Sequence, residues 1–231
     1  LGDVYKRQEF TLEGISNIQG DFQCIDYFYV KEFVMPFIRV AGDMTIALNS
    51  GSVNTAAEIE FPKLQEIGGT LTLGTNRNAN NITFPLLKKI LGSCSVTTSN
   101  LKNDIEFTNL ESIGTDGANA QIKFEIDGTN ILCPKLKTIN GKFDITTSTV
   151  IFDMEADQVS YPNVESISEN LSITCPYSDF GSNGILSIDF SGLKSAKGIS
   201  ISGQGDVTDF SSFKYPVSYT HLRAHETSAH L

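Results

Sequence analysis

The chain has 231 residues, a formal net charge of −10 at pH 7 and no tryptophan. An acidic surface of this kind disfavours sequence-independent binding to nucleic acid or to anionic lipid, because both need a basic face. No stretch approaches the roughly 20 consecutive apolar residues of a membrane helix, so we expect no membrane insertion within this segment. The length is sufficient for one large domain with a continuous interior.

The two ends differ from the rest of the chain. Residues 1–8 (LGDVYKRQ) resemble translated sequencing-adapter sequence, and so does VSYTHLRAHET within residues 216–231. Residues 216–231 hold all three histidines, which is an abrupt change of composition at a terminus. We therefore expect two non-native flanks around a single domain at residues 9–215, which is itself expected to be a fragment.

The first unusual element after the N-terminal flank is residues 25–37, IDYFYVKEFVMPF, which is dense in aromatic side chains. One interpretation is a cap that covers the end of a repeat array. The other is an exposed aromatic patch that stacks on sugars or anchors a protein partner. On the second interpretation the candidate ligand-binding residues are Tyr27, Phe28, Tyr29 and Phe33.

One short pattern then recurs along the chain, which indicates a repeat protein. The clearest copies are FPKLQEIGGTLTL at 61–73, FPLLKKILGSCSV at 84–96, CPKLKTINGKFDI at 133–145 and YPNVESISENLSI at 161–173. Weaker copies begin at Met35, Phe107 and Phe190, and partial copies begin at Ile15 and Phe210. The spacing drifts from copy to copy, as a solenoid tolerates when insertions fall in its loops.

Each copy contains two short alternations of apolar and polar residues. After the glycine, Leu71 and Leu73 flank Thr72, and before the proline Ile59 and Phe61 alternate in the same way. Period two with one apolar face predicts strands with one side buried. We therefore expect two strands per copy, in a coil of two or three short strands. The predicted outward positions of the main strand are Gln23, Thr45, Thr72, Ser95, Lys123, Asp144, Ser172 and Ser200.

Proline and glycine each recur at one position. Five of the seven prolines share a position that should mark a strand end, because proline cannot donate to a ladder: Pro36, Pro62, Pro85, Pro134 and Pro162. The recurring glycines suggest a turn that needs positive φ: Gly20, Gly42, Gly69, Gly92, Gly141 and Gly198. Glu169 stands at this position in one copy, so its turn should differ.

Helices are disfavoured throughout, because the connectors are rich in Gly, Asn, Ser and Thr and no long segment has a 3.6-residue apolar period. The predicted fold is all-β: a right-handed parallel β-helix, or solenoid, of about eight coils. Equivalent residues should then stack into an interior ladder that belongs to the core and is not a ligand platform: Phe61, Phe84, Phe107, Tyr161 and Phe190.

The recurring pattern aromatic-Pro-x-Leu-x-x-Ile-x-Gly-x-Leu-x-Ile resembles the receptor L-domain family, the leucine-rich-repeat-like β-helices. It looks closer to the relatives found in fungal cell-wall proteins and in surface proteins of gut bacteria. The resemblance covers most of residues 12–213 and implies an extracellular, often wall-anchored or lipoprotein, setting. The chain lacks the cysteine-rich modules of the receptor members, which argues against a growth-factor-receptor role.

Between the flanks there is no histidine, which excludes Ser-His-Asp and Cys-His catalysis and the usual zinc sets. We expect no catalytic residues, no cofactor and no bound metal. The four cysteines show no Cys-x-x-Cys pairing: Cys24, Cys94, Cys133 and Cys175. Because three of the four occupy positions that are apolar in other copies, we expect the cysteines to act as buried hydrophobic side chains.

Two weaker alternatives involve carboxylates. A glycan-processing β-helix enzyme could use Asp21, Asp43, Asp144 or Glu169, with Glu60 and Glu106 on the neighbouring strand. Solvated charges that keep the sheet soluble are the favoured interpretation. The second alternative is calcium at Asp153, Glu155 and Asp157, although that segment follows no known calcium-loop pattern and is better interpreted as an exposed acidic turn.

Taken together, these patterns predict a non-catalytic adhesion or recognition module at the cell surface or cell wall, with a glycan or protein as ligand and a parallel sheet as its binding face. A structural spacer is the alternative from a different class.

Overall fold

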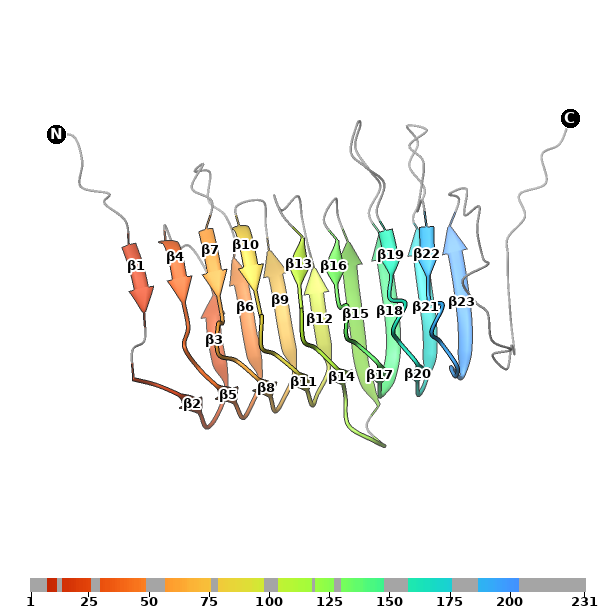
Figure 1. Ribbon diagram of the computed structural model, residues 1–231, viewed down its shortest axis with the longest axis horizontal. Coiled ribbons are helices and arrows are strands. Elements are labelled where there is room, and N and C mark those ends of the chain that lie inside the picture. Colours follow the sequence, from red (N-terminus) through yellow and green to blue (C-terminus); the bar gives the residue numbers. More distant parts are fainter. Residues whose placement is uncertain are drawn as a thin grey trace, which may run out of the picture.

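The computed structural model describes residues 8–11, 14–25, 30–48, 57–75, 79–97, 104–117, 119–126, 130–147, 158–175 and 187–203. Within these ranges the chain is all-β, without a helix, and forms a parallel β-solenoid (Figure 1). The predicted fold class is therefore confirmed. Successive coils stack side by side, and the strands pair in parallel with equivalent strands of neighbouring coils. One row is interrupted, because the strands Ile131–Leu132 and Gln158–Ser160 form no ladder with each other.

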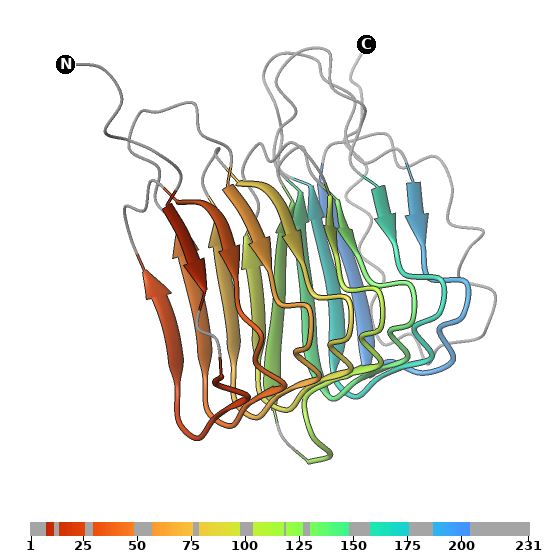
Figure 2. The same ribbon diagram turned by 60° about the vertical axis from the view of Figure 1, so that its left-hand side comes forward.

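Each coil has three sides, and each side belongs to one sheet (Figure 2). Sheet A contains β1 (Gln8–Thr11), β4 (Val30–Val34), β7 (Ala57–Glu60), β10 (Ala79–Thr83), β13 (Ile105–Glu106) and β16 (Ile131–Leu132). The pair β19 (Gln158–Ser160) and β22 (Ser187–Asp189) continues its row. Sheet B contains β2 (Asn17–Ile18), β5 (Arg39–Val40), β8 (Glu66–Ile67), β11 (Lys89–Ile90), β14 (Ser112–Ile113), β17 (Thr138–Ile139) and β20 (Ser166–Ile167).

Sheet C is the broadest side, with eight strands. They are β3 (Phe22–Ile25), β6 (Met44–Leu48), β9 (Leu71–Thr75), β12 (Cys94–Thr97), β15 (Ala120–Ile126), β18 (Gly141–Thr147), β21 (Asn170–Cys175) and β23 (Gly198–Gly203). We number the coils 1 to 8 in the order of these strands. At the usual spacing between strands, the sheet extends roughly 33 Å along the solenoid axis.

The two predicted strands of each copy correspond to sheets A and C, and the short sheet B strand between them is the third. Its inward residue is Ile67 in coil 3 and Ile90 in coil 4, and both are fully buried. A two-residue strand contributes too few positions for an alternation to be visible in the sequence. The prolines follow the sheet A strands, as predicted: Pro62 comes after β7 and Pro85 after β10.

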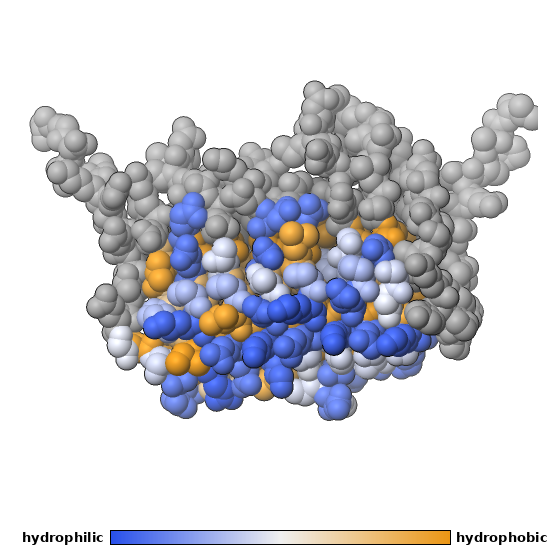
Figure 3. All heavy atoms as spheres, in the orientation of Figure 1, coloured by the Kyte–Doolittle hydropathy of each residue, from blue (hydrophilic) through white to orange (hydrophobic). Residues whose placement is uncertain are grey.

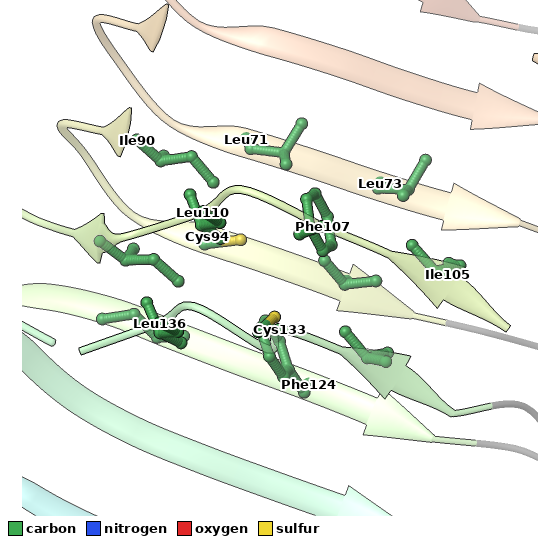
Figure 4. Packing of buried hydrophobic residues seen from close by; sticks show 14 of the residues in the cluster. Leu71, Leu73, Ile90, Cys94, Ile105, Phe107, Leu110, Phe124, Cys133 and Leu136 are labelled. Carbon is green, nitrogen blue, oxygen red and sulfur yellow. The ribbon is translucent and has the colours of Figure 1, made fainter. Parts of the chain in front are cut away.

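The interior is a continuous column of apolar side chains, part of which is shown in Figure 4. The rings of Phe61 and Phe84 stack with centroids 5.0 Å apart, and those of Phe84 and Phe107 lie 5.1 Å apart. All members of the predicted ladder are at most 1% exposed. The ladder is therefore confirmed as core.

In coil 6 the position of the aromatic ladder on the sheet A side is held by Cys133, and the aromatic rings come from sheet C instead. There the rings of Phe124 and Phe143, from sheet C, contact each other at 5.1 Å and both approach Tyr161. The Tyr161 hydroxyl donates a hydrogen bond of 3.0 Å to the carbonyl of Ile131. Two rings from the opposite wall thus occupy the volume that the small thiol leaves, as close packing of an interior requires.

The predicted reason for the recurring glycines was wrong. Among the described glycines, positive φ occurs at Gly14, Gly114 and Gly117, none of which belongs to the recurring set. At Gly69 a Cβ atom would lie 2.8 Å from the backbone of coil 2, and at Gly92 it would lie 2.6 Å from the carbonyl carbon of Gly69. Close approach of neighbouring coils therefore requires glycine there.

The register also corrects two assignments at this position. Ile199 pairs with Leu171, so the equivalent residue in coil 8 is Lys197 and not Gly198. In coil 7 the position is held by Glu169, whose turn was expected to differ. Its N–H nevertheless donates to the carbonyl of Gly141 at 3.2 Å, the same inter-coil bond that Gly69 makes to Gly42 at 2.9 Å.

Candidate binding surface

The outer face of sheet C carries the predicted outward row in register. Thr45 pairs with Thr72, Thr72 with Ser95, and the row continues through Lys123 and Asp144. Ser172 and Ser200 complete it, and Gln23 begins it. The predicted row is confirmed at every member, because a strict period of two leaves no freedom in which side chains face outward.

Alternation places a second outward row two residues further along each strand, which the sequence analysis did not identify. Its members are Ile25, Ala47, Gly74, Thr97, Glu125, Thr146, Thr174 and Ser202. The hydroxyls of Thr174 and Ser202 lie 3.3 Å apart, within hydrogen-bonding distance. Small hydroxyl side chains make up five of the eight members of the first row and four of the eight members of the second. The second row begins with Ile25, Ala47 and Gly74, so this end of the face is partly apolar, and Ile25 is exposed.

Charge gathers near the middle of this face, on β15 and β18. Lys123 forms an ion pair of 2.5 Å with Glu125, and Lys142 forms one of 2.8 Å with Asp144. Thr97 donates a hydrogen bond of 2.8 Å to Glu125 from the neighbouring strand. We call Lys123, Glu125, Lys142 and Asp144 the central cluster. It contains two positive and two negative groups and so carries no net charge.

Glu125 is the member of the central cluster with a perturbed titration. The hydrogen bond from Lys123, followed by the one from Thr97, lowers the pKa of its carboxyl group. Both contacts favour the ionised form. At neutral pH the group is therefore a fixed acceptor beside a lysine donor, and the cluster offers donors and acceptors together to a ligand.

The candidate acids of the enzymatic alternative are engaged in other roles. Asp21 accepts a hydrogen bond of 2.8 Å from the N–H of Asp43, and Asp43 accepts one of 2.6 Å from the N–H of Thr70. These carboxylates therefore join consecutive coils. Asp144 pairs with Lys142, and Glu169 pairs with Lys197 at 2.8 Å.

No second carboxylate lies beside Asp144 in the sheet C register. Its neighbours in the row are Lys123 and Ser172. Glu60 and Glu106 lie on sheet A, where Thr83 of β10 stands between them. Among the predicted acids, Asp21 and Asp43 are neighbours in register, but each carboxylate is bound to a backbone N–H of the next coil and they do not face each other across a groove.

Most of the aromatic segment lies outside the described residues, including Tyr27, Phe28 and Tyr29. Phe33 is described and points into the interior, where it is 9% exposed and contacts the ring of Phe61 edge-on at 6.4 Å. Phe37, from the same segment, is fully buried against Phe22 with ring centroids 5.1 Å apart. Phe33 and Phe37 thus belong to the core, whereas Ile25 at the start of the segment is exposed.

The described ranges contain no group of three or more potential metal-ligating side chains. Asp153, Glu155 and Asp157, considered above for calcium, lie outside them. Cys24, Cys94 and Cys133 are buried free thiols, as predicted, and burial raises the pKa of Cys94 to about 12. Such a thiol stays protonated and unreactive.

Comparisons with known proteins identify no relative of the chain. The chain matches no protein-family model, no curated protein and no solved structure. In the described part of the chain, no helix is long and apolar enough to cross a membrane.

Proposed function

We propose that this solenoid is a non-catalytic recognition module of the cell surface or cell wall, which presents the outer face of sheet C to a glycan or protein ligand. The observation that carries the proposal is the regular outer face itself, with two in-register rows in which small hydroxyl side chains are the most frequent kind, around the neutral central cluster. A ligand would make many weak contacts along this face, and no single residue would dominate.

Three features support the proposal. The resemblance of the repeat to the L-domain family favours an extracellular setting. The engagement of Asp21 and Asp43 with backbone N–H groups, and of Asp144 with Lys142, supports a non-catalytic role. The absence of net charge in the central cluster suits a neutral ligand rich in hydroxyl groups, because such a ligand needs donors and acceptors equally.

The test is a binding screen of the full chain against glycans and cell-wall polysaccharides. The variant Lys123→Ala/Asp144→Ala removes one charge of each sign from the central cluster, and Tyr27→Ala/Tyr29→Ala alters the aromatic segment. The matched control, Glu60→Ala/Lys63→Ala, also removes one charge of each sign but lies away from sheet C. We expect the first variant to bind more weakly than wild type, while the control binds as wild type does.

Loss of binding in the tyrosine variant alone would move the site to the aromatic segment. No binding by wild-type protein with a β-rich circular dichroism spectrum would contradict a glycan ligand. That result would favour a protein ligand or a structural spacer. The spacer is the second candidate because the described surface exposes no large aromatic side chain of the kind that anchors protein interfaces.

A further inference from the structure

The corner of the solenoid formed by sheet B carries charges whose sign alternates from coil to coil. In each coil, the corner segment begins one residue before the sheet B strand and ends at the position of the recurring glycine. In coil 8, which has no sheet B strand, it is residues 194–197. The insertion at 115–119 of coil 5 is not counted in it. Within this segment each described coil from 2 to 8 has charges of one sign only. In order, they are Arg39, then Glu66, then Lys88 and Lys89, then Glu111, then Lys137, then Glu165 and Glu169, then Lys194 and Lys197.

Stacking places these alternating charges beside one another. The N–H of Glu111 donates to the carbonyl of Lys88 at 2.8 Å, and the N–H of Lys137 donates to that of Glu111 at 3.0 Å. The chain of bonds continues from Glu165 to Lys137 and from Lys194 to Glu165. A band of strongly hydrophilic residues crosses this part of the surface in Figure 3.

Several of the stacked charges form ion pairs. Arg39 meets Glu66 at 2.8 Å, Lys194 meets Glu165 at 2.6 Å and Lys197 meets Glu169 at 2.8 Å. All of these pairs join consecutive coils: the first joins coils 2 and 3, and the other two join coils 7 and 8. Coils two apart carry the same sign and therefore repel each other if they are brought into contact.

This alternation matters because other features of the fold distinguish the coils poorly. The inward positions hold similar apolar residues in most coils, such as Ile67, Ile90 and Ile113 in sheet B. The sheet B strands pair over only two residues each. Repeats of similar sequence can therefore stack in a wrong order, which is a characteristic failure of repeat proteins.

We propose that the alternating corner charges fix the order in which the coils stack, because any arrangement that skips a coil places like charges side by side. The core supplies the stability of the stack, and the corner supplies the discrimination between right and wrong neighbours. Opposing charges that raise the energy of wrong partners are a general source of specificity.

The test compares three variants of the full chain. Glu111→Lys gives coils 4, 5 and 6 the same sign at the corner. Its control is Glu106→Lys, which makes the same change of charge in the same coil but on sheet A, between Thr83 and Leu132. The third variant inverts every charge of the corner segment: Arg39→Glu, Glu66→Lys, Lys88→Glu, Lys89→Glu, Glu111→Lys, Lys137→Glu, Glu165→Lys, Glu169→Lys, Lys194→Glu and Lys197→Glu.

The readouts are the recovery of monomer after dilution from urea and the Tm at low and high salt. We expect Glu111→Lys to lose most of the monomer yield and to lower the Tm by roughly 3–6 °C at low salt. The loss should shrink in 1 M salt, where charges are screened beyond about 3 Å. The control and the inverted row should refold as wild type does, because both preserve the alternation.

Two results would overturn the proposal. One is that Glu111→Lys and Glu106→Lys behave alike at low salt. The other is that the inverted row refolds as poorly as Glu111→Lys, which would show that the individual residues matter and the alternation does not. If Glu111→Lys yields no folded protein, Glu111→Gln removes the attraction without adding repulsion, and a refolding yield equal to that of wild type at low salt would likewise overturn the proposal.

Discussion

Glycine at the corner position of coils 3 and 4 shows how the smallest residue allows two coils to approach closely. Gly69 and Gly92 have ordinary φ values, so their freedom of backbone conformation is not what the fold uses. The N–H of Gly92 donates to the carbonyl of Gly69 at 3.0 Å, which holds the two backbones too close for a Cβ atom. At these two positions the coils therefore approach too closely for a side chain. Glu169 and Lys197 make the equivalent bond in coils 7 and 8 with side chains present, so the bond itself does not require glycine.

This account predicts a large cost for Gly69→Ala. The new methyl group would meet Gly42 and Asp43 backbone atoms at 2.8 Å, so the coils must separate or distort. We expect a loss of about 2–4 kcal/mol in the free energy of unfolding, measured by urea denaturation. Gly74→Ala is the matched control, because its Cβ would meet nothing within 4 Å. Equal destabilisation by both substitutions would contradict the steric explanation.

At the scale of the elements, the interior stays filled because an aromatic ring from either sheet A or sheet C faces a smaller residue on the other sheet. Coil 4 places Phe84 on the sheet A side and the small Cys94 on sheet C. Coil 6 reverses this arrangement with Cys133 and Phe143. A small residue on one wall is therefore matched by a large residue on the other. The sequence pattern of one wall alone does not show how the interior is filled.

The compensation predicts that Cys133→Phe overpacks coil 6, although phenylalanine is the commonest residue at that position. The rings of Phe143 and Phe124 already lie beside Tyr161 there. We expect a destabilisation of about 1–3 kcal/mol by urea denaturation. Adding Phe143→Leu should restore most of the loss, since Leu71 and Leu171 occupy the same position in coils 3 and 7. A double variant no more stable than the single one would refute this explanation.

The ion pairs of the corner predict a dependence on pH. The hydrogen bond from Lys194, followed by its charge and that of Lys137, lowers the pKa of Glu165 in the folded protein. A lowered pKa stabilises the fold above the unfolded value of about 4.3, and this contribution is lost as the pH falls through the folded value. Wild type should therefore have a higher Tm than Glu165→Gln at pH 7, with the difference vanishing near pH 3. A constant difference would exclude ionisation as the cause.

At the scale of the whole molecule, repetition explains which parts of the structure were predictable. Because equivalent residues stack, a pattern seen in one copy applies to all, and this is why the outward row from Gln23 to Ser200 and the ring ladder were predicted correctly. The two-residue strands of sheet B were missed as a separate side, since alternation needs more positions to be visible. The second outward row follows from the same period and could have been found by extending each strand.

The remaining features depend on which residues of neighbouring coils lie side by side. Comparing the repeat copies in the sequence does not determine this register. The insertion before β15 obscures that Glu111 stacks between Lys88 and Lys137, and a shift of one residue led to Gly198 being placed where Lys197 stands. The close approach at Gly69 likewise depends on how tightly two coils pack. The sequence therefore predicted a candidate site in the aromatic segment, whereas the structure indicates the central cluster on sheet C as the candidate.

The insertion in coil 5 allows the modular character of the whole solenoid to be tested. Ten residues separate Phe61 from Leu71, but fifteen separate the equivalent Phe107 from Ile122. Deleting residues 115–119 would join Gly114 to Ala120 and restore the common spacing, with Ala120 remaining at the glycine position opposite Gly141. Because stacked positions are kept and only a loop is shortened, we expect cooperative unfolding with a Tm equal to or slightly above that of wild type.

The deletion has an internal control in a shift of register. Removing residues 115–118 alone would leave one extra residue and would displace the inward side chains of β15, including Ile122 and Phe124, to the outer face. That variant should lose cooperative unfolding, measured by circular dichroism during heating. If both deletions unfolded alike, the coil would tolerate a change of register, and stacking of equivalent residues could not be what determines this fold.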